Sequence, residues 1–214
     1  MTGNRLYAHL LKRMILPLGE RLCGTHVLDN LRQLEKSQWW APEQLRALQV
    51  EKLRALLAHA GEHVPYYRQA FRQVGFDPRA VDTVQALQCL PILTKREVRR
   101  YLHGLLADNY AQAALIPQHT SGSTGDPRHY YNHRAAQDRR MAATLRLWRW
   151  AGYAFGDRWV RLGSLPRAGW QKDLEAALSR CCYLQFREAD DVILRARIAA
   201  IQQARPVMIR GYPS

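Results

Sequence analysis

The fold is decided by a stretch of eight residues, Thr120-Ser121-Gly122-Ser123-Thr124-Gly125-Asp126-Pro127. Six small hydroxyl or glycine residues stand in a row and are closed by an acid and a proline. Small side chains let a ligand approach the backbone, glycines reach positive φ so that successive N–H groups can point inward, and hydroxyls add donors. These are the properties of a loop that grips phosphate.

Other interpretations of this stretch are an ordinary polar turn, a Walker A loop and a Rossmann loop. Turns use the same residue types, but eight ordered positions are a stronger signal than a short Ser/Gly run. A Walker A loop needs a lysine and a hydroxyl where Asp126 and Pro127 stand. A Rossmann loop opens a helix, whereas the strand-like run 128–133 follows here. The loop is therefore predicted to join two neighbouring strands, with Gly122 or Gly125 at positive φ.

This pattern resembles the phosphate-loop signature of the adenylate-forming enzymes, which comprise acyl-CoA synthetases, peptide-synthetase adenylation domains and luciferases. The resemblance runs from about residue 35 to the last residue. It is narrowed to the phenylacetate-CoA ligase and CapK-like branch by four further segments, Trp39-Trp40, Val64-Pro65-Tyr66-Tyr67-Arg68, Leu90-Pro91-Ile92-Leu93-Thr94-Lys95 and Gly211-Tyr212-Pro213-Ser214.

The resemblance implies an ATP-dependent, AMP-forming carboxylate-CoA ligase that uses Mg²⁺, a carboxylic acid and CoA or another thiol. The residues that it implies for binding the β and γ phosphates are Thr120, Ser121, Gly122, Ser123, Thr124 and Gly125. Asp126 departs from the family, where lysine is common, and a carboxylate beside phosphates is unfavourable unless Arg128 compensates it. No catalytic residue and no metal ligand is assigned, because the family's other catalytic parts lie beyond this sequence.

The length and net charge of the sequence limit the kinds of function that it can have. The 214 residues are 47% hydrophobic, which is enough for a sizeable core in one or two domains, and the formal charge is +14. A positive charge of this size is typical of proteins that bind nucleic acid or an anionic membrane. The basic residues are spread over the whole length without a nucleic-acid motif, so the sequence argues against nucleic acid as the partner.

Cysteines and the N-terminus give expectations about compartment and membrane. Cys23, Cys89, Cys181 and Cys182 form no metal-binding spacing, so reduced thiols in the cytoplasm are expected. Residues 5–22 are apolar with basic interruptions and too short in their uncharged run to span a bilayer. This segment is expected to dock onto the helical region behind it, and peripheral contact with an anionic surface stays open as the alternative.

The first part of the chain is predicted to be mainly helical. Helices are expected over 42–61, 66–74 and 95–107, the last with Thr94 as N-cap and Glu97 completing a capping box. The apolar face of the first of these helices is predicted to contain Leu45, Leu48, Leu53, Leu56 and Leu57. Three histidines are predicted to be surface or cap residues rather than catalysts, namely His59, His63 and His103.

After residue 110 strands alternate with helices, which predicts a layered α/β sheet. Strands are expected at 114–118, 128–133, 159–162, 181–186 and 207–210, and helices at 135–151, 171–180 and 190–204. The first of these helices is predicted to have a core face containing Met141, Leu145 and Trp148, and a basic face containing Arg139, Arg146 and Arg149.

The predicted fold class is therefore α/β, with a mainly helical region over 1–110 and a partial adenylate-forming subdomain with its phosphate loop over 111–214. Complete members of the family are about twice as long, so we expect an N-terminal portion that is inactive by itself. We expect apolar surface around Leu145, Trp148 and 159–162 that further chain would cover.

Two other function classes stay open. The first is a non-enzymatic basic module that binds nucleic acid or an acidic partner, with salt-sensitive binding that is independent of the loop. The second is a subunit whose site is completed by a separately encoded C-terminal half, in which case ATP binding appears only on mixing.

Overall fold

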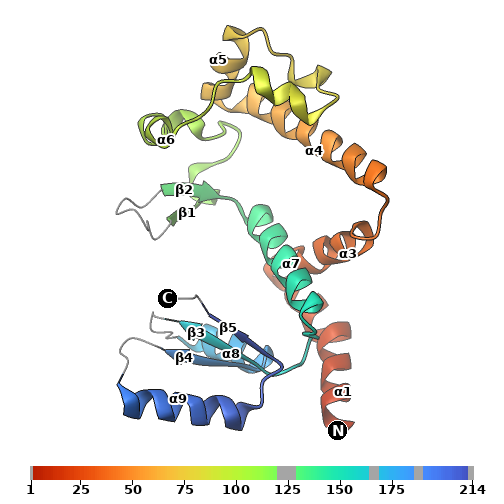
Figure 1. Ribbon diagram of the computed structural model, residues 1–214, viewed down its shortest axis with the longest axis vertical. Helices are drawn as coiled ribbons and strands as arrows, with labels where there is room; N and C mark the ends of the chain where they lie inside the picture. Colours follow the sequence, from red (N-terminus) through yellow and green to blue (C-terminus); the bar gives the residue numbers. More distant parts are fainter. Residues whose placement is uncertain (1, 120–128, 164–168, 186–189, 212–214) are drawn as a thin grey trace. The chain divides into compact units, whose positions relative to one another are not determined.

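The computed structural model describes residues 2–119, 129–163, 169–185 and 190–211, and its elements are drawn in Figure 1. The chain divides into two compact units, one formed by Met1–Leu31 with Met141–Ser214 and the other by Arg32–Arg140. Helices α3 (Val27–Ser37) and α7 (Arg134–Trp150) contain residues of both units. The domain boundary near residue 110 that the sequence suggests remains a proposal.

The second unit has a core between helices α4 (Pro42–His63) and α5 (Pro65–Gln73). The core is formed by Leu57, Phe71 and Val81 with partly buried neighbours. Gly61 permits this packing, because a Cβ there would lie 3.0 Å from the Phe71 ring. Both helices were predicted from the sequence, and both are present. Each begins with a proline, which is favoured at the first position of a helix.

The predicted apolar face of α4 is partly wrong. Leu57 is buried, but Leu45 and Leu56 are exposed. The partners of α4 are α5 and the 3₁₀ turn Pro78–Ala80, and the core side chains that they meet lie in the second half of the helix. Leu45 lies before that half, and Leu56 is turned about 100° from Leu57.

Helix α6 (Lys95–Arg100) begins as predicted and ends early. The Thr94 hydroxyl accepts the Glu97 N–H at 3.3 Å, and Glu97 Oε2 accepts the Thr94 N–H at 2.8 Å, which completes the capping box. The Thr94 hydroxyl also donates to Glu97 Oε2 at 2.6 Å, and this bond, followed by the one from the Thr94 N–H, lowers the pKa of Glu97. Tyr101 leaves the helical region at φ −107, and a 3₁₀ turn over His103–Leu105 replaces the predicted helix to residue 107.

The predicted loop is flanked by two paired strands. Strand β1 (Ile116–His119) and strand β2 (His129–Asn132) are antiparallel neighbours, and β2 leads into α7. This confirms that the chain between them joins neighbouring strands. The loop residues 120–128, and with them the expected positive φ at Gly122 or Gly125, lie outside the described residues.

The first unit contains a three-stranded parallel sheet in the order β4-β3-β5. Its strands are β3 (Trp159–Gly163), β4 (Cys181–Gln185) and β5 (Met208–Arg210), and they are linked by helices α8 (Trp170–Leu178) and α9 (Asp191–Ala204). The first crossover runs from β3 to β4, and the second runs from β4 back past β3 to β5, so the direction reverses as in a doubly wound sheet. The predicted single layered sheet is thus corrected to two separate sheets in the described residues.

The core of the first unit is already buried by residues of these 214. Leu145, Trp159, Val160 and Leu184 are buried, and the Trp148 and Trp159 rings lie 4.8 Å apart. Burial also raises the pKa of Tyr153, a neighbour of Trp148, to about 12. The expectation that further chain is needed to cover Leu145 and β3 is therefore wrong for these residues. Met141, predicted in the core face, is exposed because the ring contacts of α7 are made by Trp148, two turns later.

The N-terminal helix runs through α1 (Thr2–Leu10), a π-helical turn (Leu11–Ile15) and α2 (Leu16–Cys23), and ends at Gly24 with φ 62. It packs on other parts of its own unit. The Tyr7 hydroxyl donates to the Leu178 carbonyl at 2.7 Å, and the Arg180 guanidinium lies 5.7 Å from the Tyr7 ring. None of the helices in the described ranges is long and apolar enough to cross a membrane.

Candidate functional site

The candidate site is the end of the β1–β2 hairpin, where the predicted phosphate loop begins and ends. The register pairs Ile116 with Asn132 and closes with His119 opposite His129. The chain leaves β1 after one histidine and enters β2 at the other, so this pair fixes the separation of the two ends of the loop. All six predicted binding residues, together with Asp126 and Arg128, lie outside the described residues: Thr120, Ser121, Gly122, Ser123, Thr124 and Gly125.

The two histidines at the hairpin end form an exposed cross-strand pair. Their ring centroids are 6.4 Å apart with an interplanar angle of 43°. Facing positions on antiparallel strands bring side chains together in this way. Imidazole can donate a hydrogen bond and gains positive charge in acid, so both rings could add donors beside an anionic ligand. Sequence reasoning did not select His119 or His129, although their positions directly flanking the loop were the available signal.

The base of the hairpin is held by a stacked pair of rings. Tyr110, which lies before β1, stacks on His133 with centroids 5.0 Å apart and an interplanar angle of 11°. The Nδ1 atom of His133 accepts the Ala136 N–H at 3.3 Å, so the residue that follows β2 also caps the first turn of α7. The stack joins the segment before β1 to the residue after β2, and this clamps the hairpin at the end opposite the loop.

Further rings continue this clamp into α4. The Tyr110 ring lies 6.1 Å from His59, and His59 lies 4.9 Å from His63. Asn109 Nδ2 lies 3.3 Å from His59 Nε2. The row of rings therefore runs from the C-terminal turn of α4 to the base of the hairpin.

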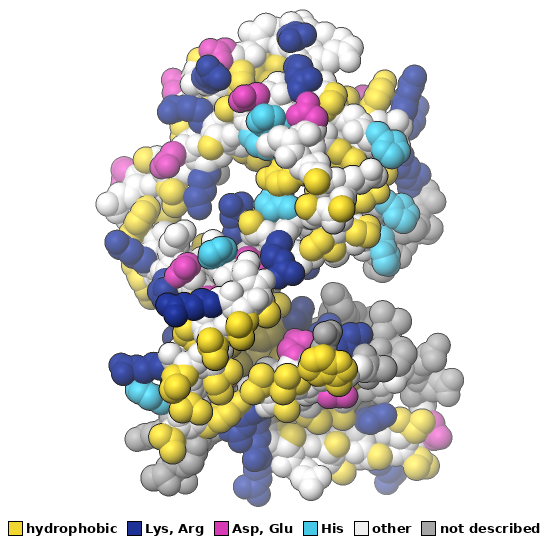
Figure 2. Space-filling model, turned by 180° about the vertical axis from the view of Figure 1, so that it is seen from behind, with side chains coloured by type: hydrophobic (Ala, Val, Ile, Leu, Met, Phe, Trp, Pro, Cys, Tyr) yellow, Lys and Arg dark blue, Asp and Glu magenta, His cyan; other side chains and the backbone are white. Residues whose placement is uncertain are grey.

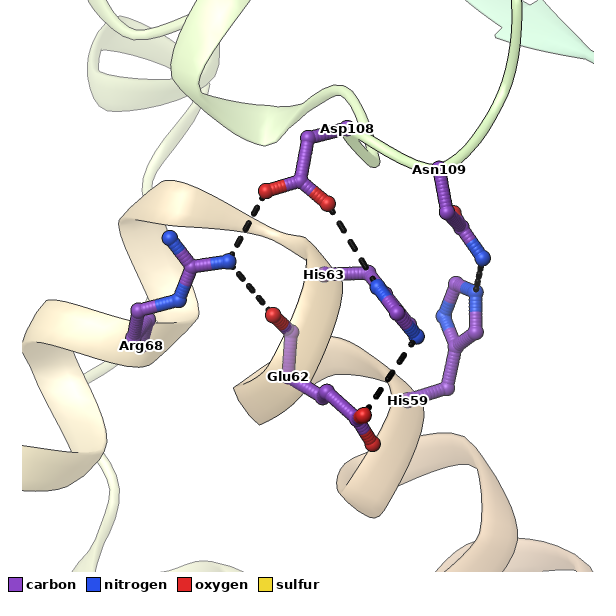
Figure 3. A network of polar contacts seen from close by, with 6 residues as sticks. All are labelled: His59, Glu62, His63, Arg68, Asp108 and Asn109. Atoms are coloured by element: carbon purple, nitrogen blue, oxygen red, sulfur yellow. Dashed lines mark hydrogen bonds and ion pairs between the residues drawn. The ribbon is translucent and has the colours of Figure 1, made fainter.

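Asp108 is the polar centre of the same region, as Figure 3 shows. Arg68 Nη2 donates to Asp108 Oδ2 at 2.8 Å, and His63 Nδ1 lies 3.4 Å from Asp108 Oδ1. The Asp108 N–H donates to the His63 carbonyl at 2.8 Å, and Arg68 also donates to the Glu62 carbonyl. The hydrogen bond from Arg68 is the main reason that the pKa of Asp108 is lowered.

This network ties the segment before β1 to the end of α4 and the start of α5. The residues joined by dashed lines in Figure 3 are His59, Glu62, His63, Arg68, Asp108 and Asn109, which include no serine, threonine or cysteine to act as a nucleophile. The expectation that His59 and His63 are not catalysts stays a prediction. The sequence did not indicate the network, because its partners are 40 and 50 residues apart.

Mg²⁺, which the resemblance implies together with ATP, finds no cluster of ligands here. Among the described residues no group of three or more His, Cys, Asp or Glu could hold a metal ion. We therefore assign no step to a protein-bound metal.

Comparisons with known proteins show what this chain is similar to. The chain is 37% identical over 86 residues to a phenylacetate-coenzyme A ligase of Thermus thermophilus, covering 40% of this chain and 19% of that protein. It is 34% identical over 99 residues to the phenylacetate-coenzyme A ligase of Aromatoleum evansii, covering 46% of this chain and 22% of that protein. The chain thus spans about a fifth of the length of these relatives. No family model matches it.

Solved structures give the fold. A 2-hydroxyisobutyryl-CoA ligase, solved in complex with 2-HIB-AMP and CoA, superposes with a TM-score of 0.59 at 19% identity, covering 79% of this chain and 37% of that one. The same ligase in its postadenylation state gives a TM-score of 0.58 at 18% identity. At this identity the likeness shows the fold. With the phenylacetate-CoA ligase matches, it confirms the family resemblance and the fold class drawn from the sequence.

Proposed function

We propose, from the premise that this chain is a relative of the adenylate-forming acyl-CoA ligases, that it supplies the phosphate-gripping part of an ATP-dependent carboxylate-CoA ligase. The observation that carries the proposal is the loop 120–127 joined at both ends to paired antiparallel strands. The CapK-like variety of phenylacetate-CoA ligase is the proposed branch. The carboxylic acid substrate and a CoA-like thiol belong to the same proposal.

The proposed reaction explains why a phosphate loop is needed. A carboxylate is a poor electrophile, because its reaction with a thiol would have to expel oxide. In the proposed first step a carboxylate oxygen bonds to the α phosphorus of ATP, and pyrophosphate leaves with the electron pair of the broken P–O bond. A thiol then displaces AMP to give the thioester. Donors on the loop would stabilise the charge that develops on the departing pyrophosphate.

The 214 residues by themselves are proposed to form no acyl-adenylate. The residues implied by the family for adenine, for Mg²⁺ and for the mobile lysine have no assigned counterpart in this sequence. A cytoplasmic, reducing setting is also proposed, and the spacing of the four cysteines in the sequence supports it.

The test is calorimetric binding of pyrophosphate and of ATP to the full chain. Weak binding is expected, and Ser123→Ala with Thr124→Ala should weaken it by about 1–3 kcal/mol, the range for losing donors to a charged group. The matched control is Ser37→Ala with Thr83→Ala, which removes the same hydroxyls away from the loop and should leave binding unchanged. Carboxylate-dependent ATP–pyrophosphate exchange should be absent.

Three outcomes would contradict parts of the proposal. Carboxylate-dependent ATP–pyrophosphate exchange by this chain alone would overturn the proposal that it forms no acyl-adenylate. Binding that ignores the loop variant but collapses with modest salt would favour the basic module for nucleic acid or an acidic partner. Absence of any binding until a second protein is added would favour a site completed by a separate chain.

A further inference from the structure

The N-terminal helix carries a stripe of exposed apolar side chains. The members recur every fourth residue and are 46 to 78% exposed, and they are Leu6, Leu10, Met14, Leu18 and Leu22. Single exposed apolar residues are common on protein surfaces, but a row of this length along one helix is not. We call these five residues the apolar stripe.

The other side of the same helix is fixed to its own unit. Leu11 is buried, Tyr7 donates its hydroxyl proton to the Leu178 carbonyl at 2.7 Å, and a Cβ at Gly156 would lie 3.0 Å from the side chain of Ala8. The helix therefore has a docked side and a free side. The stripe is on the free side, so exposure of these side chains does not depend on the helix detaching.

A π-helical turn keeps the stripe in line. Positions four apart drift around an α-helix, because a turn takes only about 3.6 residues. The middle of this helix, Leu11–Ile15, is π-helical, and its wider turns take back part of that drift. Met14 lies in this turn, between Leu10 and Leu18. The five side chains consequently follow a straighter line than a continuous α-helix would give them.

The charges beside the stripe are basic. Lys12, Arg13 and Arg21 are exposed, and Glu20 is the one acidic residue between positions 6 and 23. Its Oε1 atom accepts the Leu28 N–H at 2.8 Å, which turns this carboxylate toward the start of α3. Figure 2 shows hydrophobic side chains gathered with basic ones over the lower part of the view, where this helix lies. The helix thus combines an apolar row on its free side with exposed positive charge, of which Arg13 and Arg21 adjoin the row.

We infer that this face of the N-terminal helix binds the surface of an anionic lipid bilayer, with the apolar stripe inserted among the lipid headgroups. A helix with one apolar face and lysine or arginine beside it lies in the interface of a membrane, where both parts contribute to binding. Charge complementarity selects an anionic surface over a neutral one. A second copy of the chain would bring the same basic residues together, which their repulsion opposes.

The experiment is flotation of the full chain with vesicles of phosphatidylcholine alone or of an equal mixture of phosphatidylcholine and phosphatidylserine. Binding to the mixed vesicles is expected, with little binding to phosphatidylcholine. Met14→Gln with Leu18→Gln should weaken partitioning by about tenfold or more, since two buried apolar side chains are lost. Lys12→Gln with Arg13→Gln should weaken binding to the mixed vesicles only.

Each variant has a matched control in the second unit. Leu56→Gln with Ile92→Gln changes two exposed apolar residues, and Lys95→Gln with Arg96→Gln changes an identical exposed basic pair. Both controls should bind as the parent does, and circular dichroism should show that every variant is folded. Equal binding to both vesicle types, or binding that the stripe variant leaves intact, would overturn the proposal. So would a dimer in lipid-free solution that the stripe variant dissociates, because a second copy would then cover the stripe.

Discussion

Asp108 is the residue at which the end of α4, the start of α5 and the segment before β1 meet. Its carboxylate accepts from Arg68 and faces His63, while its N–H donates to the His63 carbonyl. The side chain is half exposed, so its charge is partly screened by water. Its importance is therefore one of position: it holds Asn109 and Tyr110 where their side chains can reach His59 and His133.

Asp108→Asn should lower stability at neutral pH and have little effect in acid. The pKa of Asp108 is lowered in the folded protein, so its stabilisation is present above the ordinary carboxyl pKa and is lost as pH falls through the lowered value. Urea unfolding at neutral pH and in acid well below an ordinary aspartate pKa of about 3.9, where the carboxyl is protonated in both states, measures the two limits. Asp82→Asn, an exposed aspartate of the same unit, is the control. An equal loss at both pH values would show that the carboxylate charge is not what matters.

Among the elements, the caps are where local sequence decided structure most directly. Thr94 and Glu97 form the predicted capping box because all of its partners lie within three residues. Thr83 also precedes a short helix, the 3₁₀ turn Val84–Cys89, but its side chain makes no capping hydrogen bond. Thr94 therefore caps the helix that follows it, whereas Thr83 occupies the N-cap position of its 3₁₀ turn without a capping hydrogen bond.

Thr94→Ala should cost about 0.5–2 kcal/mol of unfolding free energy, the usual range for loss of an N-cap. Thr83→Ala should stay within about 0.5 kcal/mol, as expected of a surface change that breaks no capping bond. Chemical denaturation of the two variants, compared at equal m-value, measures the difference. If the two threonines prove equivalent, the capping box does not contribute to stability.

The same contrast between local and distant partners explains what the sequence could predict. Helix starts at Pro42, Pro65 and Thr94, and the strands beside the loop, follow from residues close together in the chain. The separation of the strands into two sheets depends on pairings such as Trp159 with Met208, which no local pattern encodes. The ring row from α4 to the hairpin was missed for the same reason.

The predicted binding loop shows the other limit. Its composition predicted a phosphate loop, which stays a prediction, and two flanking strands, both of which are present. The histidine pair at its ends became visible only through the register, because a shift of one residue would place the two rings on opposite faces. Thus the strands beside the loop could be predicted from the sequence, whereas the ring pairs that flank the hairpin required the fold.

At the scale of the whole molecule, each unit has its own core. Phe71 is 4% exposed in the core of the second unit, and Leu184 is equally buried in the parallel sheet of the first. A large-to-small substitution removes packing only around the side chain that is lost, at a cost of about 3–5 kcal/mol for phenylalanine and about 2–5 kcal/mol for leucine. Such substitutions can therefore distinguish two independently opening units from one cooperative structure.

Phe71→Ala should accelerate amide hydrogen exchange in α4 and α5 while leaving β3 and β4 protected, because local opening has its own free energy in each cooperative unit. Leu184→Ala should do the reverse. Exchange followed by mass spectrometry of peptic peptides measures both at once, with Leu56→Ala, an exposed leucine of α4, as the control that should change neither. If either core substitution accelerates exchange in both units to the same extent, the chain opens as one cooperative structure, and the two cores depend on each other for stability.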